Sequence, residues 1–324
     1  MRSRLAIIPV LLLGLGLASC GDNAPAGETG EADALTVVAS TNAYGDIVKQ
    51  VAGDAVTVES IINRASQDPH SYEATPQDKL TLSHADLVVA NGGGYDPFIG
   101  TLTQDLGTEP SSIITAVDLS PTIHADEAPH DDETHGASPA TEGHSGHDHA
   151  SFNEHVWYDL PTAAAVATEV ADRLGELKPD EAATFTANAG AFTAGIDGLE
   201  ARLQHLAQNG QGQEFAMTEP VPFYLLTSAG LADGTPEGFS GAIEAGRDVS
   251  PLLLKELDEK LSSGKISLLA YNAQTSGPQT EAVREDAEAA GVPVVEFTET
   301  LPEGTDYLAW MGSNIDAIAQ ALQD

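Results

Sequence analysis

The sequence alternates twice between short apolar runs and amphipathic segments of helical period, and one long amphipathic run separates the two series. Parallel strands must be joined by crossover segments, so this alternation is typical of a parallel sheet covered by helices. The first series begins at Leu35 and the second at Phe215, which predicts an α/β fold of two lobes. The expected strands are residues 35–39, 56–62, 85–90 and 112–117 in the first lobe and 215–218, 266–271 and 292–297 in the second.

The long run between the two series predicts a single helix. Pro179 suits the first helical turn, and large apolar residues recur after it at spacings of three, four and seven. At about 1.5 Å per residue the helix would extend roughly 40 Å, enough to accompany both lobes. We therefore expect a first lobe over residues 35–178, a backbone helix over 179–208 and a second lobe over 209–324.

The amino-terminal residues 1–19 are predicted to be a signal peptide. Arginines precede an apolar run that is too short to span a bilayer, and small residues then lead to the cysteine at position 20. This junction resembles a bacterial lipobox, which implies that Cys20 is lipidated and that residues 20–34 form a flexible tether. The alternative is an ordinary secretory signal with an incidental cysteine.

The charge balance excludes several classes of partner. The chain carries 50 acidic residues against 13 lysines and arginines, a formal net charge of -37. Binding to nucleic acid requires clustered basic residues, so no nucleic-acid partner is expected, whereas a cation is favoured. Cys20 is the one cysteine, which excludes an internal disulfide and a thiolate-rich metal site.

Residues 124–151 have a different composition from the rest of the chain. The segment is rich in histidine and acidic residues and lacks large apolar side chains, so we expect a disordered insertion in the first lobe. Short histidine tracts bind transition metals weakly, and an auxiliary metal-binding loop is one interpretation. A solvated spacer is the other. The histidines concerned are His124, His130, His135, His144, His147 and His149.

Two histidines outside residues 124–151 are candidate metal ligands. His70 follows the second expected strand in Asp68-Pro69-His70, where the proline stiffens the loop. His155 lies where ordered structure is expected to resume after the insertion. Neutral imidazole is the commonest protein ligand for divalent metals, although a capping or packing role would suit either histidine taken alone.

Two glutamates follow expected strands of the second lobe. Glu219 comes directly after residues 215–218, and Glu299 follows residues 292–297. Ligands of open α/β sheets collect at the carboxyl ends of strands, so both carboxylates would face a cleft between lobes. The alternative is that both are exposed turn or capping carboxylates. Asp306 and Glu296 are further candidate carboxylates.

The order of these sites resembles the metal-ion solute-binding lipoproteins of zinc and manganese ABC importers. That family has two α/β lobes joined by a rigid backbone helix and holds one metal ion between them. The resemblance implies that His70 and His155 are the first-lobe ligands, and that Glu219 and Glu299 supply the second-lobe ligands. The segments that carry it are DPHSYEATPQD, NGGGYDPFIG, the His-rich insertion before EHVWYDLP, TEPVPFYLLTSAGL, YNAQT and VPVVEFTETLPEGTDYLAWM.

The resemblance predicts a receptor that captures Zn²⁺, or Mn²⁺ as the second choice, and delivers it to the permease of an ABC importer. Carboxylates suit manganese, whereas imidazoles and the His-rich loop favour zinc. We expect a monomer that is not an enzyme, lipid-anchored in the cell membrane on the extracellular or periplasmic side. The alternatives are a secreted zinc-dependent hydrolase, whose metal would keep one position open for water, and an adhesin lipoprotein with an incidental metal.

Overall fold

The computed structural model describes residues 35–125 and 152–323. The predicted signal peptide, Cys20, the tether and the histidines at positions 130–149 lie outside these residues. His124 belongs to the short helix α4 (Pro121–Ala125), so helical structure continues into the start of the segment predicted to be a disordered insertion. Within the described ranges no helix is both long enough and apolar enough to cross a bilayer.

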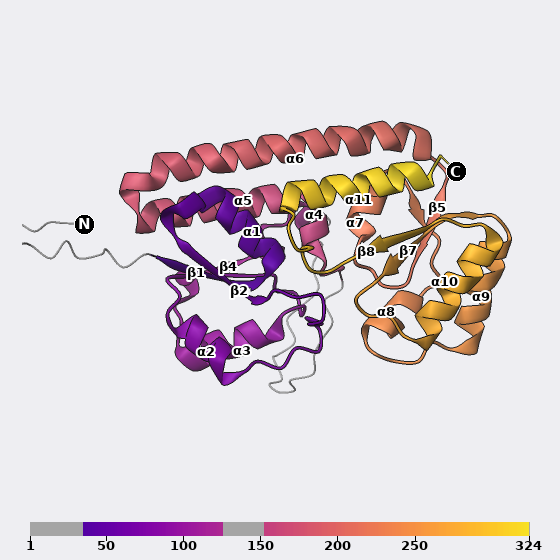
Figure 1. Cartoon of the computed structure of the whole chain (residues 1–324), viewed down its shortest axis with the longest axis horizontal. Helices are drawn as coiled ribbons and strands as arrows, with labels where there is room; N and C mark the ends of the chain where they lie inside the picture. The colour runs from indigo at the N-terminus through magenta and orange to yellow at the C-terminus, as the bar shows by residue number, and fades with distance from the viewer. Residues whose placement is uncertain (1–34, 126–151, 324) are drawn as a thin grey trace, which may run out of the picture. The chain divides into compact units, whose positions relative to one another are not determined.

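The first lobe is built on a parallel four-stranded sheet in the order β2-β1-β3-β4. Its central strands β1 and β3 are buried almost throughout because helices cover both faces of the sheet. Helices α1 and α5 cover one face, and α2 and α3 cover the other (Figure 1). The strands are β1 (Thr36–Thr41), β2 (Thr57–Ile62), β3 (Leu87–Ala90) and β4 (Ile113–Thr115), and the helices are α1 (Asn42–Ala52), α2 (Pro76–Ser83), α3 (Pro97–Leu106) and α5 (Leu160–Leu177).

The second lobe repeats this arrangement with a parallel sheet in the order β6-β5-β7-β8. Helices α7 and α11 pack on one face, and α8, α9 and α10 pack on the other (Figure 1). The strands are β5 (Glu214–Met217), β6 (Ala232–Asp233), β7 (Ile266–Asn272) and β8 (Val294–Phe297), and the helices are α7 (Phe223–Ser228), α8 (Phe239–Glu244), α9 (Pro251–Ser262), α10 (Pro278–Ala290) and α11 (Tyr307–Ala321).

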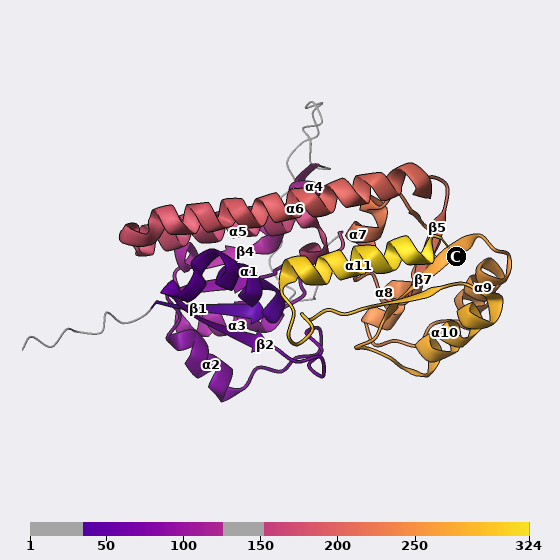
Figure 2. The ribbon, with the colours of Figure 1, turned by 45° about the horizontal axis from the view of Figure 1, so that its top comes forward.

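The predicted backbone helix is α6, which extends over Ala182–Gly210. It begins three residues later than expected because Pro179–Glu181 form a 3-10 turn. Its apolar stripe, which includes Phe185 and Phe192, is buried against α1 and α5 of the first lobe and against α7 and α11 of the second (Figures 1 and 2). One continuous apolar core thus joins both sheets through α6, and the predicted α/β class with two lobes is confirmed.

The sequence pattern does not predict α3, β6 or α8. Strand β6 has only two residues, and α8 has only six, so neither is long enough to establish a periodicity. Helix α3 begins at Pro97, separated by two residues from the glycine turn at residues 92–94, whose glycines adopt positive φ angles. The missed helix α8 matters most, because its last residue enters the candidate site.

Candidate metal centre

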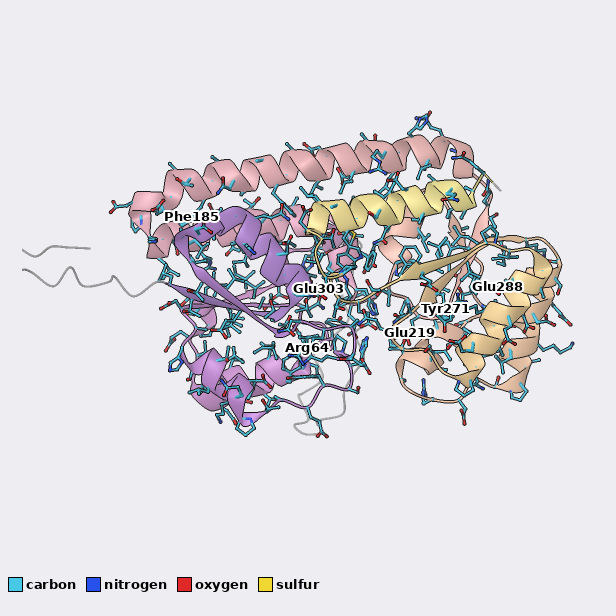
Figure 3. All side chains as sticks on the ribbon, in the orientation of Figure 1. Arg64, Phe185, Glu219, Tyr271, Glu288 and Glu303 are labelled. Carbon is cyan, nitrogen blue, oxygen red and sulfur yellow. The ribbon has the colours of Figure 1, made fainter. Side chains whose placement is uncertain are left out.

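Side chains that follow the carboxyl ends of strands in both sheets converge on one buried polar cluster. His70 follows β2 in the first lobe, whereas Glu219 follows β5 and Glu299 follows β8 in the second. The carboxyl edge of a parallel sheet is where α/β folds bind ligands, because the chain leaves each strand there in a loop. Glu219 lies where the second lobe faces the first (Figure 3).

His70 is held by the loop that precedes α2. The Asp68 carboxylate accepts the backbone N–H of His70 at 3.0 Å and the Ser71 hydroxyl at 2.6 Å, which fixes the turn around Pro69. The imidazole of His70 is 16% exposed and lies edge-on to the buried Tyr95 ring, with the ring centroids 5.0 Å apart. The sequence prediction that a stiff turn presents this histidine therefore agrees with the local geometry.

His155 is buried completely at the start of a 3-10 turn, Val156–Tyr158. Its Nδ1 lies 2.7 Å from Asn153 Oδ1, and the other end of the same amide donates from Nδ2 to the Pro220 carbonyl at 2.7 Å. Because the amide oxygen only accepts, Nδ1 of His155 carries the proton and Nε2 presents a lone pair. Among the described residues Nε2 has no hydrogen-bond partner, although it is buried. Burial, and then His70, lower the pKa of His155 well below its usual value, so the ring is neutral.

Replacing Asn153 by alanine is expected to weaken zinc binding about 10- to 100-fold, since groups that orient a ligating histidine typically contribute this much. Asn153→Asp keeps an acceptor for His155 Nδ1 but loses the donor to Pro220, so its loss should be smaller. Competitive titration with a chromophoric zinc chelator measures both. Equal losses in the two variants would show that the link to Pro220, rather than the histidine tautomer, is what matters.

Glu154 directly precedes His155 in the sequence but contacts the other histidine, His70. Its Oε1 lies 3.3 Å from His70 Nδ1, which directs the opposite nitrogen, Nε2, toward the second lobe. Gly94 leaves space for this carboxylate, since a Cβ there would lie 3.0 Å from Glu154 Oε2. Burial, followed by repulsion from Glu244, raises the pKa of Glu154 to about 8. The sequence offers no signal for this role beyond adjacency to His155.

Glu299 supplies a buried carboxylate at the first-lobe histidine. Its Oε2 lies 3.8 Å from His70 Nε2 and accepts the Tyr95 hydroxyl at 3.2 Å, while its Oε1 accepts from Asn272 Nδ2 at 2.8 Å. Burial, and then the charge of Glu219, raise the pKa of Glu299 to about 8. The structure therefore brings Glu299 together with His70, as the sequence predicts for a shared site.

Glu219 is buried in the same region but is bonded differently. Its Oε2 accepts from Asn272 Nδ2, and its Oε1 accepts from the Thr275 hydroxyl at 2.6 Å. Asn272 is the last residue of β7 and Thr275 lies in the segment that follows it. Asn272 bonds Glu299 at the same time. Burial raises the pKa of Glu219. Both of its carboxylate oxygens are thus engaged by neutral donors of its own lobe.

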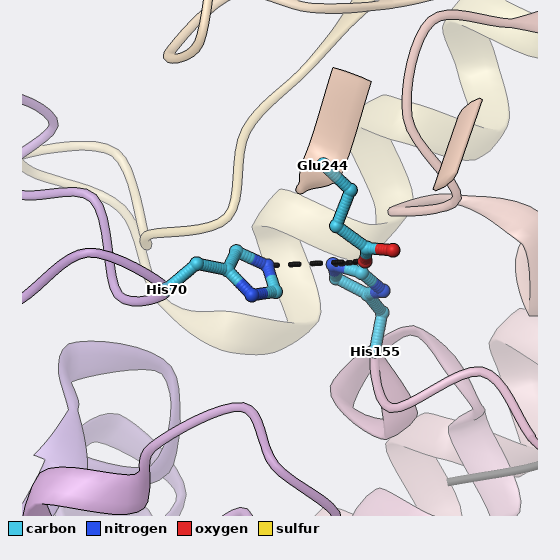
Figure 4. A group of neighbouring side chains, drawn as sticks. All are labelled: His70, His155 and Glu244. Carbon is cyan, nitrogen blue, oxygen red and sulfur yellow. Dashed lines mark ion pairs between the residues drawn. The ribbon is translucent and has the colours of Figure 1, made fainter. Parts of the chain in front are cut away.

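A carboxylate that the sequence analysis missed completes the cluster. Glu244, the last residue of α8, places Oε1 3.7 Å from His155 Nε2 and 3.9 Å from His70 Nε2 (Figure 4). These three side chains each offer one ligand atom, and the three atoms lie within 4.8 Å of one another. Burial, and then Glu219, raise the pKa of Glu244 to about 7. Nothing marks Glu244 in the sequence, because the strand before it, β6, is too short to be predicted and the residue belongs to no segment of the resemblance.

The cluster is short of positive charge. Glu154, Glu219, Glu244 and Glu299 surround two histidines, and His155 is neutral. Across residues 35–125 and 152–323, the ion pairs of lysine and arginine are all made with other acids. Two imidazole nitrogens and several buried carboxylates without a cation are the donor set that a divalent transition metal requires.

The remaining sequence candidates lie elsewhere. Glu296 pairs with Arg284 at 3.1 Å, and Asp306 caps α11 by accepting the Ala309 N–H at 2.8 Å. His124 is exposed and its Nε2 lies 3.1 Å from the Asp118 carbonyl oxygen. Glu296 lies within β8 and Asp306 follows it, and these bonds explain why neither acid serves the cluster.

Two parallel α/β lobes joined by one long helix, with a polar cluster at the facing strand ends, define the class of two-lobed solute-binding proteins. The family model described as "ZnuA: Zinc-uptake complex component A periplasmic" matches residues 37–321. The chain belongs to this family.

Similarity to individual proteins extends over almost the whole length. The manganese ABC transporter substrate-binding lipoprotein ScaA of Streptococcus gordonii is 25% identical over 98% of this chain and 97% of its own. The iron ABC transporter substrate-binding lipoprotein MtsA of Streptococcus pyogenes serotype M1 is 25% identical over 91% of each chain. The solved periplasmic zinc binding protein TroA of Treponema pallidum has the same fold, with a TM-score of 0.69 and 23% identity over 89% of this chain and 99% of that one.

Proposed function

We propose that this protein is an extracytoplasmic receptor that binds one divalent transition-metal ion between its lobes and delivers it to the permease of an ABC importer. The observation that carries the proposal is the convergence of His70, His155 and Glu244 from both lobes on a common point, with Glu299 beside them. Family membership and the names of the relatives, which are substrate-binding lipoproteins of ABC transporters, support the receptor role.

Binding rather than catalysis is the role of this chain. Its relatives are substrate-binding proteins, which removes the alternative of a zinc-dependent hydrolase. The chemistry of the cluster agrees, because the donors at hand are sufficient to surround a metal ion with protein ligands. We propose His70 and His155 as the nitrogen ligands and Glu299 as a carboxylate ligand; Glu219 is the second carboxylate that the family pattern implies.

Zinc is the metal that we propose as the preferred cargo. Two imidazole nitrogens, one of them buried with its lone pair directed into the cluster, are ligands that suit zinc, and zinc binds more tightly than manganese to such donors. The relatives are named for manganese, iron and zinc, so family membership alone leaves the choice open. Manganese is the alternative, because the carboxylates would suit it.

The receptor is proposed to act outside the cytoplasm, held at the membrane by a lipid on Cys20. The relatives named as lipoproteins support this location, and the small acidic composition of residues 20–34 suits a tether. We propose that the histidines of the segment 124–151 form an auxiliary loop that binds metal weakly.

Titration of the metal-free mature protein with Zn²⁺, in competition with Mn²⁺, tests the proposal. We expect one tightly bound zinc ion per chain, because the cluster has ligands for a single ion. A matched variant replaces His130, His135, His144, His147 and His149 by asparagine. This variant should lose any weakly bound zinc ions and keep the tightly bound one.

Two outcomes would contradict parts of this proposal. If the variant loses the tight ion, the binding site lies in the histidine-rich segment and the cluster is misassigned. If Mn²⁺ competes as strongly as Zn²⁺ in both proteins, the cargo is manganese.

A further inference from the structure

Helix α8 brings a carboxylate to the histidines from a part of the second lobe that the family resemblance does not mark. Glu244 ends α8, and the helix lines a cavity of about 400 Å³ together with Asn153, Glu154 and Pro220. The buried Phe239 at the start of α8 packs in the core beneath β5 and β7, which fixes the helix. The side chain of Glu244 then reaches across to the first lobe (Figure 4).

The ligand atoms of His70, His155 and Glu244 lie within 4.8 Å of one another, and Glu299 adjoins this group through His70. With zinc bonds of about 2.0–2.1 Å, neighbouring ligand atoms of a tetrahedral site are roughly 3.3 Å apart. The three measured separations are 3.7 Å from Glu244 Oε1 to His155 Nε2, 3.9 Å from the same oxygen to His70 Nε2, and 3.8 Å from Glu299 Oε2 to His70 Nε2. Each needs to shorten by only about half an ångström around an ion.

Glu219 has a different set of contacts. Both of its oxygens accept hydrogen bonds, one from Thr275 and one from the Asn272 amide that also bonds Glu299. Through Asn272, Glu219 therefore orients Glu299. A carboxylate oxygen can accept a hydrogen bond and bind a metal at once, so position is what distinguishes Glu219. The carboxylates of the described residues that pair with the two histidines are those of Glu154, Glu244 and Glu299.

We infer that Glu244 is a direct ligand of the bound metal ion, together with His70, His155 and Glu299, and that Glu219 is a positioning residue for Glu299. This inference rests on the proposed function. Glu244 is also the most exposed of the four ligands, at 21% against 16% for His70 and 0% for the other two. Its side chain is therefore the one of the four that is most accessible to solvent.

Glutamine variants separate these roles, because glutamine keeps the size of glutamate and removes its charge. With Zn²⁺ as the probe, Glu244→Gln should weaken binding about 100-fold or more, beyond the loss typical of an indirect group. It should also speed release to a chelator. Glu219→Gln should weaken binding about tenfold, the low end of the range for an orienting group, because Glu219 acts on Glu299 only through Asn272. Glu237→Gln, an exposed residue just before α8, is the matched control and should leave binding unchanged.

A cysteine at position 244 reports contact with the metal directly. In the mature chain carrying Cys20→Ser, Glu244→Cys provides the sole thiol. If residue 244 binds the ion, adding Co²⁺ should produce a thiolate-to-cobalt charge-transfer absorption band, and Glu219→Cys should produce none. A circular dichroism spectrum of each variant checks that the fold is retained.

The reverse result, a band with Glu219→Cys and none with Glu244→Cys, would overturn the inference and establish the ligand set implied by the family resemblance. Failure of the proposed function looks different. In that case the unsubstituted protein itself would bind no stoichiometric Zn²⁺ or Co²⁺.

Discussion

Replacing His155 by alanine is expected to abolish high-affinity zinc binding, with a loss of about 1,000-fold or more. Groups that merely orient a ligand contribute about 10- to 100-fold, so removing a ligating nitrogen must cost more. A thousandfold loss corresponds to about 4 kcal/mol of binding free energy. His155 deserves the first test because it is fully buried, its Nδ1 is fixed by Asn153, and its Nε2 points to Glu244.

His155→Ala must be compared with a second variant whose side chain fills the space of the imidazole ring. The ring packs against Trp157, with centroids 5.1 Å apart, so alanine leaves a cavity that could lower stability. His155→Gln fills most of this volume and is a poor metal ligand, and it should lose affinity to a similar extent. His84→Ala, an exposed histidine at the end of α2, is the control. Isothermal titration with Zn²⁺ measures all three, and retained tight binding in His155→Gln would remove His155 from the site.

The second large expected effect is a dependence of the metal-free protein's stability on pH. Its sign is opposite to that produced by carboxylates whose pKa is lowered on folding. Glu154 and Glu299 have pKa values raised to about 8, and Glu244 to about 7, chiefly because burial disfavours their charged forms. The folded, metal-free protein therefore keeps protons that the unfolded chain has released well below pH 7. Each group contributes its full stabilisation below the unfolded-state pKa of about 4.5, and the contribution is lost as pH rises from there through the folded pKa values of about 7 to 8.

Zinc should reverse this trend. The ion takes the place of the protons, so binding releases them, and the affinity falls as pH decreases from about 8. Between pH 6.5 and 8.5 we expect the melting temperature of the metal-free protein to fall and the increase caused by zinc to grow. One buried group with a pKa near 8 contributes about 2 kcal/mol over this interval. His155 has the opposite sign, but its lowered pKa confines its effect to pH below 6.5.

Calorimetric melting at several pH values, with and without Zn²⁺, measures both trends. The large net negative charge also opposes folding as pH rises, so the scans are repeated at high salt. Salt screens exposed charges but affects buried groups much less. A metal-free melting temperature that rises from pH 6.5 to 8.5 at high salt would contradict the raised pKa values.

The sequence predicts the fold and part of the cluster because those signals are local. Strand–helix alternation and the apolar stripe of residues 179–208 follow from the periods of single elements, and the structure has both sheets and α6. The proline turn before His70 and the strand end before Glu299 are equally local, and the two side chains do lie together. For Glu219 the same strand-end rule places the residue in the right region but says nothing of its bonds to Asn272 and Thr275.

By itself, then, the sequence determined two parallel α/β lobes, the helix between them and the loops that present the histidines. Only the tertiary structure decided which groups surround those histidines. Glu244 lies on a six-residue helix with no readable period and meets His70 from more than half the chain away. The proton position on His155 depends on an amide that also bonds Pro220 in the other lobe. Such partners are fixed by the packing of the lobes on α6, and side-chain contacts between distant segments leave no periodic trace in a sequence.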